Sequence, residues 1–248
     1  MSERLRLFKR IFISFIYLVI FIGIGTGFYF LLKKEPILPL PIVPTPTIYP
    51  IETIWSQSFI TGQDIYSVAA KIINPNTNFG ASNFNYSFYL YDSNNVLIGT
   101  LNGKSFIWPG ESKYIVEGGI SLMKAPIKAV LNIENPTWHE VKNFKSINLT
   151  LGNINYGKGE PGSGKFFMVD FTASNNTPFD LKKVYISAIV STKEGLPIAV
   201  SSTILENFKS KEQKSFSIPW FLEFKGVPSS VDLSISTNLW ETPELLLQ

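Results

Sequence analysis

The 248-residue chain contains no cysteine and only one histidine, His139. Without cysteine it can form neither disulfides nor thiolate metal sites, and it has no cysteine nucleophile. One imidazole cannot build a histidine-based metal site, and a Ser-His-Asp triad would have to be centred on His139. We therefore expect no cofactor, no metal and no enzymatic activity. His139 is interpreted as a surface residue between two domains.

Excess positive charge is missing from most of the chain. The formal net charge is +3, but residues 1–35 hold six Lys/Arg and two Asp/Glu, which leaves sixteen against seventeen in the rest. A part without net positive charge has no general attraction for phosphate backbones. The sequence therefore predicts no nucleic-acid partner.

Charge is also absent from residues 11–32, a predominantly apolar run of 22 residues. A helix of this length reaches about 33 Å, enough to cross a hydrocarbon core of about 30 Å. The run is longer than the apolar stretch of a cleaved signal peptide, which is the alternative, and no small-residue cleavage site follows it. We predict an uncleaved transmembrane helix over residues 11–32, with the lipid bilayer as a partner.

The basic residues around this run predict its orientation. Four Lys/Arg residues lie within residues 1–10, and only Lys33 and Lys34 follow the run. The positive-inside rule then keeps residues 1–10 in the cytoplasm and places the C-terminal domains outside. We expect a single-pass protein of the cell membrane. Within the helix, Gly23 and Gly27 have the spacing of small residues that pack two helices together, although glycine is also simply tolerated in membrane helices.

Residues 33–50 form a proline-rich segment without glycine or serine. Such spacing of proline prevents helix and central strand and favours extended polyproline II. We interpret this segment as a stalk. Beyond it, sequence patterns recur with a period of about 100 residues: residues 74–77 match 174–178, residues 126–133 match 228–235, and Trp138 matches Trp240.

The repeated parts have the pattern of β-strands. Residues 84, 86, 88 and 90 are apolar or aromatic and alternate with more polar neighbours, which is typical of a half-buried strand, and residues 92–95 follow as turn formers. No stretch after residue 50 has a persuasive helical stripe. The fold class is therefore predicted as mainly β, with two tandem immunoglobulin-like β-sandwich domains over residues 51–138 and 139–248.

Residues 88–92 spell F-x-L-Y-D, and residues 109–111 add a Pro-Gly-Glu turn before the next strand. The first domain thereby resembles the FxLYD domain family over residues 64–134. The resemblance implies an immunoglobulin-like sandwich found mostly in exported or membrane-anchored prokaryotic proteins, without an established catalytic activity. The second domain lacks the motif, with Ala188 and Val190 at its apolar positions, so its membership follows from the internal repeat alone.

Two short motifs suggest chemistry and are interpreted as turns. Residues 159–165 match most of a P-loop, but Phe166 replaces the magnesium-binding hydroxyl and a strand-like segment follows, so we predict no nucleotide binding. Asp92 and Asn94 have the spacing of calcium ligands, yet the glycine and glutamate of such a loop are missing. A Gly-rich hairpin loop and a hairpin turn are the expectations.

Aromatic side chains supply the candidate binding surface. Trp138 and Trp240 recur at matching positions and are assigned to the core or to a domain junction. Trp55, Phe79, Phe84 and Trp108 are then the candidates for surface contact, and loops carry recognition on such scaffolds.

We expect a non-catalytic protein that acts in cell-envelope binding or assembly, with a protein partner whose identity the sequence does not indicate. One alternative is a structural subunit of an envelope complex that self-associates through its transmembrane helix. Another alternative is a hydrolase with a site assembled between the domains, although no spaced pair of carboxylates suggests one.

Overall fold

The computed structural model describes residues 3–33, 46–142, 144 and 146–241. The chain divides into two compact units, Met1–Pro46 and Thr47–Gln248. Most of the predicted stalk, residues 34–45, lies outside the described residues. Residues 46–50 are described and contain neither helix nor strand.

The first unit contains one helix, α1 (Glu3–Leu32), which includes the predicted span and also residues 3–10. Its Arg6–Leu32 part is long and apolar enough to cross a membrane, and none of the tested window is buried within the protein. A helix in the core of a water-soluble domain would be mostly buried. This helix therefore has the properties of a membrane anchor or of a signal sequence.

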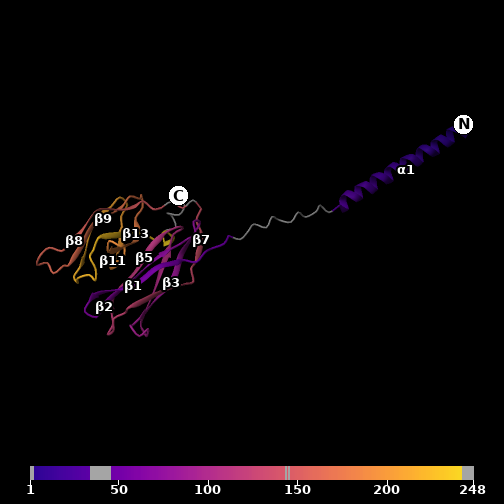
Figure 1. Cartoon of the computed structure of the whole chain (residues 1–248). Coiled ribbons are helices and arrows are strands. Elements are labelled where there is room, and N and C mark those ends of the chain that lie inside the picture. The colour runs from indigo at the N-terminus through magenta and orange to yellow at the C-terminus, as the bar shows by residue number, and fades with distance from the viewer. Residues whose placement is uncertain (1–2, 34–45, 143, 145, 242–248) are drawn as a thin grey trace. The chain divides into compact units, whose positions relative to one another are not determined.

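The second unit is mainly β, as predicted, and Figure 1 labels most of its strands. A single 3-10 turn, η1 (Leu239–Glu241), ends the part of this unit that the structure describes. The thirteen strands have the following bounds: β1 (Glu52–Gly62), β2 (Ile65–Ile73), β3 (Phe79–Tyr91), β4 (Leu97–Ile107), β5 (Ser112–Ser121), β6 (Lys128–Glu134), β7 (Trp138–Glu140), β8 (Leu149–Lys158), β9 (Phe167–Asn175), β10 (Leu181–Ser191), β11 (Pro197–Phe208), β12 (Gln213–Trp220) and β13 (Ser230–Ser236).

These strands form four antiparallel sheets. Sheet A has the order β1-β2-β5, and sheet B has the order β4-β3-β6 with β7 also paired to β3. Sheet C has the order β12-β9-β8, and sheet D has the order β11-β10-β13. We refer to β1–β7 as the first half and to β8–η1 as the second half.

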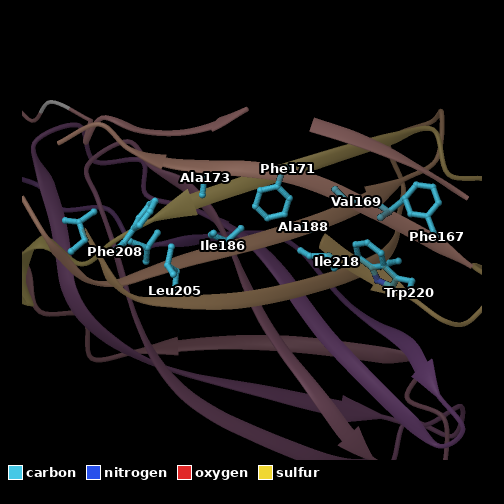
Figure 2. Packing of buried hydrophobic residues seen from close by; sticks show 14 residues of the cluster. Phe167, Val169, Phe171, Ala173, Ile186, Ala188, Leu205, Phe208, Ile218 and Trp220 are labelled. Atoms are coloured by element: carbon cyan, nitrogen blue, oxygen red, sulfur yellow. The ribbon is translucent and has the colours of Figure 1, made fainter. Parts of the chain in front are cut away.

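Each half has its own hydrophobic core, formed by the alternate residues of its strands that point inward. In β9 every second residue is buried, from Phe167 to Asn175, which is the period-two pattern of a strand with one covered face. Figure 2 shows Phe171, Ile186 and other apolar side chains of the second half lying in a row along the strands. The buried members of that core come from sheets C and D. The core of the first half comes from sheets A and B, with Val68, Ala70, Ile72, Ala81, Phe84, Tyr86, Phe88, Leu90, Ile107, Ile115, Ala129 and Leu131.

The two halves share details of their loops as well as their strand order. The backbone N–H of Asn74 donates to Glu111 O at 2.9 Å, and that of Asn175 donates to Glu212 O at 3.0 Å. Both asparagine side chains are completely buried. Each side-chain amide nitrogen donates to backbone carbonyls of neighbouring loops and strand ends: Phe79 and Trp108 in the first half, and Phe179, Phe208 and Lys209 in the second half.

The halves are in contact within this unit. Phe59 and Ala69 from sheet A form a buried cluster with Ile189 and Val200 from sheet D. The predicted domain boundary after residue 138 falls inside β7, which pairs with β3. Residues 139 and 140 therefore belong to the first half.

Candidate binding cavity between the two halves

Two of the four predicted surface aromatics are buried, so their assignment to a binding surface is wrong. Phe84 is 0% exposed and lies in the core of the first half, on the same face of β3 as Phe88. Trp108 is 3% exposed and stacks against Trp240. Trp55 and Phe79 are half-buried, and Trp55 packs against the Phe59 cluster between the halves.

The two remaining tryptophans of the sequence analysis have the structural roles expected of them. Trp138 is partly buried and packs against the core of the first half. Trp240 belongs to a second cluster between the halves, together with the buried residues Phe106, Trp108 and Leu239.

In α1, Gly23 and Gly27 are one helical turn apart. No heavy atom from elsewhere in the described structure lies within 4 Å of the position that a Cβ would take at either residue. The same holds for Gly25. Gly23 and Gly27 are therefore distinguished only by their spacing, which is that of small residues that pack two helices together.

His139 lies in β7 and is exposed, between the halves as expected. Its Nε2 is 2.9 Å from the Ser82 hydroxyl, and its ring centroid is 5.9 Å from that of Trp240. A serine beside a base is part of a hydrolase site, but such a site also needs a group that orients the base. Within the described ranges, no carboxylate is hydrogen-bonded to His139.

The two motif-like loops are turns between paired strands, as predicted. Residues 159–166 connect β8 to β9, with no helix after them. Asp92 closes the hairpin between β3 and β4, where its Oδ1 accepts the N–H of Asn94 at 2.9 Å and of Val96 at 3.0 Å. The bond from Val96 is the largest cause that lowers the pKa of Asp92, and Lys124 adds to it.

A cavity of about 440 Å³ lies between the two halves, lined by β4 and β5 on one side and by β10, β11 and β13 on the other. Lys104 and Ile204, both exposed, are among its lining residues, so the cavity opens to solvent. Its inner wall includes Lys113 and Tyr185. We refer to it as the inter-half cavity.

Lys113 is the most unusual residue of this cavity, because it is only 4% exposed. Alternation in β5 places Lys113 on the same side as the core residue Ile115. Its Nζ donates to Phe106 O at 3.1 Å and lies 3.5 Å from the centroid of the Phe106 ring, with the Tyr185 ring at 5.9 Å. Burial lowers the pKa of the Lys113 ammonium, because the charged form loses its hydration, and the negative charge of Glu111 opposes this shift in part.

No carboxylate among the described residues forms an ion pair with Lys113. The nearest acid in sequence, Glu111, accepts the backbone N–H of Trp108 at 2.7 Å through its Oε2. An ammonium has three donor hydrogens, and one bond to a carbonyl leaves donors for a further group.

Tyr86 and Glu117 line the same cavity and join the two sheets of the first half. The Tyr86 hydroxyl donates to Glu117 Oε1 at 2.5 Å. Burial, followed by this hydrogen bond, raises the pKa of Tyr86. Gly103 faces Tyr86 across the strand pair, and a Cβ there would lie 2.2 Å from the tyrosine oxygen. Tyr86 can therefore cross β4 only because residue 103 has no side chain.

Tyr114 connects the halves beside the cavity. Its hydroxyl donates to Asp232 Oδ2 on β13. Burial is the main cause that raises the pKa of Tyr114, and the carboxylate of Asp232 adds to it. The cavity wall is thus held by hydrogen bonds within and between the halves.

None of these cavity residues was selected from the sequence. Lys113 did carry a signal, because it has the same strand parity as Ile115 and should therefore point inward. The sequence gives no sign that Tyr185 lies beside Lys113 or that Asp232 bonds to Tyr114, since Tyr185 and Asp232 come from the other half of the chain.

No protein-family model matches the chain, and a search of curated proteins finds no match to it. Among the described residues, no group of three or more His, Asp or Glu side chains is placed to hold a metal ion.

Proposed function

We propose that the chain is a membrane-anchored, non-catalytic binding protein of the cell envelope. The observation that carries this proposal is the apolar helix Arg6–Leu32 joined in sequence to a β-sheet unit with a solvent-open cavity. In this proposal α1 stays in the cell membrane, residues 1–10 are cytoplasmic, and the β-sheet unit lies outside.

The β-sheet unit is proposed to be a tandem pair of immunoglobulin-like sandwiches. Strands β1, β2 and β5 form one sheet of the first half, and β4, β3 and β6 form the other, which corresponds to the order A-B-E and C′-C-F of that fold. Sheets C and D repeat this order with strands β8 to β13. The matching buried asparagines, Asn74 and Asn175, give the duplication further support.

The FxLYD assignment of the first half stays part of this proposal. Its motif lies at the end of β3, where Phe88 and Leu90 are completely buried and Asp92 closes the following hairpin. These positions give the motif a structural purpose in the fold. The second half is included because its strand order is the same.

A binding role is favoured over catalysis by the character of the contacts. Two apolar clusters join the halves, so both halves can contribute to one binding surface. The single Ser–His pair of the described chain lacks a carboxylate that orients the histidine. A surface formed by both halves beside an open cavity suits recognition of a partner.

The anchor is tested with a C-terminal tag on the full chain in intact cells. We expect the tag to stay with the membrane after carbonate washing and to be digested by external protease. A matched chain with Ile16, Ile20 and Ile24 changed to Lys should lose membrane retention, because charges at the helix centre oppose insertion. A tag that is released by carbonate, or protected from protease, contradicts the proposal.

The partner is tested by crosslinking in intact cells, followed by capture through the same tag. A specific envelope protein should be recovered with the full chain and not with the helix alone. Recovery of the same proteins with both chains would mean that the β-sheet unit selects no partner.

Self-association through α1 is a second candidate function, favoured by the four-residue spacing of Gly23 and Gly27. Changing both residues to Leu should abolish dimer crosslinking in the membrane. Gly25→Leu is the matched control, since residue 25 lies on the opposite side of the helix. Equal crosslinking in all three chains would exclude this mode of assembly.

A further inference from the structure

We propose that the inter-half cavity is a binding site for a small hydroxylated carboxylate of the uronic-acid type, with its acid group paired to the Lys113 ammonium. This inference rests on the binding function proposed above and names a ligand class for it. It requires neither the transmembrane orientation nor self-association through α1.

The charge of Lys113 is the first argument. Its ammonium is almost completely removed from water, yet its one hydrogen bond goes to the neutral carbonyl of Phe106. Buried charges in proteins are normally paired, because the loss of hydration is otherwise uncompensated. Lys113 is among the residues that line the cavity, so an anion bound there can approach its ammonium and supply the missing partner.

The second half supplies an internal comparison. Lys214 of β12 follows Glu212 by two residues, just as Lys113 of β5 follows Glu111. Lys214 pairs with Glu212 at 3.3 Å, and its side chain is 40% exposed. Lys113 instead lies between Phe106 and Tyr185, away from an ion pair. The same Glu-x-Lys spacing therefore gives a lysine in an ion pair in one half and a buried cavity lysine without an ion pair in the other.

The other residues that line the cavity indicate which groups the ligand has besides its carboxylate. It includes six serine or threonine residues, whose hydroxyls can both donate and accept hydrogen bonds: Ser105, Ser187, Ser202, Thr203, Ser234 and Ser236. Its one acidic residue, Glu117, is already bonded to Tyr86. A ligand with several hydroxyl groups and one carboxylate matches this lining. The volume of about 440 Å³ is within the usual range for small-molecule sites.

The test is calorimetric titration of the full chain in a neutral detergent, with glucuronate as the probe. We expect saturable binding of glucuronate, and at least tenfold weaker binding of glucose, acetate and inorganic phosphate. Glucose lacks the charge, whereas acetate and phosphate lack the sugar hydroxyls. Equal affinity for acetate or phosphate would overturn the sugar part of the proposal, and no saturable glucuronate binding would overturn it entirely.

Two variants and a control locate the site. Lys113→Met should weaken glucuronate binding at least tenfold, whereas Lys214→Met should leave it unchanged. Ile204→Trp should also weaken binding, because it places a large ring at an exposed position of the cavity lining and leaves the core intact. Unchanged affinity in a folded Lys113→Met or Ile204→Trp chain would place the ligand elsewhere. If crosslinking recovers an envelope partner but glucuronate does not bind, the proposed binding function stands and only the ligand class proposed here is overturned.

Discussion

Trp108 and Trp240 stack face to face, although 132 positions separate them in the sequence. Their ring centroids are 3.8 Å apart and their planes differ by 9°. Trp108 follows β4 of the first half, and Trp240 lies in η1 of the second half. The indole N–H of Trp108 also donates to Thr237 O at 3.1 Å. Trp108 is therefore bound to the second half through both its ring face and its nitrogen.

We predict that Trp240→Ala lowers the free energy of unfolding by about 3 kcal/mol, because it removes a large partly buried ring and leaves a cavity beside Trp108. Urea denaturation followed by circular dichroism measures this loss. Phe221→Ala is the matched control, since Phe221 is 62% exposed. A loss no larger than that of the control would mean that the stack does not hold the halves together.

Gly80 provides an independent test of the same junction. A Cβ on Gly80 would lie 2.7 Å from Cη2 of Trp240, 3.0 Å from Cδ of Pro109 and 3.1 Å from the carbonyl oxygen of Ile107. We expect Gly80→Ala to destabilise the chain by about 1–3 kcal/mol through overpacking. The measurement is the shift of the urea midpoint.

Gly152→Ala is the control for this variant, because no neighbouring atom lies within 4 Å of the added methyl group. Equal midpoints for the two variants would show that the Trp240 side chain moves away without cost. In that case adding Trp240→Ala to the Gly80→Ala chain should not raise its urea midpoint.

Local patterning explains which parts of the fold the sequence could predict. The alternation from residue 84 to residue 90 predicts one buried face, and β3 contains it with Phe84, Phe88 and Leu90 completely buried. The same alternation already places Phe84 on the inner face with Phe88. The strand period therefore determines the burial of Phe84, although an Asn-rich loop precedes it in the sequence.

Long-range packing explains what could not be predicted. Trp108 comes at a strand end before a turn, where an aromatic side chain is usually accessible. Its burial depends on Trp240 and Leu239, which arrive from the other half. Likewise, the burial of Lys113 depends on Tyr185 of β10. No pattern within β4 or β5 specifies those partners.

The buried asparagines lead to a third prediction. Asn175 donates through its Nδ2 to three backbone carbonyls, and its Oδ1 accepts from the N–H and hydroxyl of Thr177. Asn175→Ala leaves these groups without partners in a buried place, so we expect a loss of about 2–4 kcal/mol. Asn94→Ala, at an exposed turn position, should change stability by less than about 0.5 kcal/mol.

Thermal or urea unfolding of the two asparagine variants measures the difference. Asn74→Ala should behave like Asn175→Ala, because Asn74 is equally buried and bonds to Phe79 and Trp108 in the same manner. A large loss at Asn175 with none at Asn74 would argue against equivalent roles in the two halves.

Lys113 makes stability depend on pH. Burial holds its pKa in the folded chain below the ordinary value, which is about 10.4 in an unfolded chain. Between these two pKa values the unfolded chain binds more protons, so stability rises with pH across that window. Below the pKa that Lys113 has in the folded chain, the residue is charged in both states, and the folded chain bears the full cost of burying the ammonium.

Lys113→Met removes this titration. We expect its stability, relative to that of the unchanged chain, to fall steadily as pH rises toward about 10, because only the unchanged chain gains stability there. Urea midpoints between pH 7 and 10 measure the effect, and the range stops where tyrosines begin to ionise. Lys214→Met should run parallel to the unchanged chain, since no buried ammonium is lost. Parallel curves for Lys113→Met as well would mean that Lys113 reaches water or an anionic partner in solution.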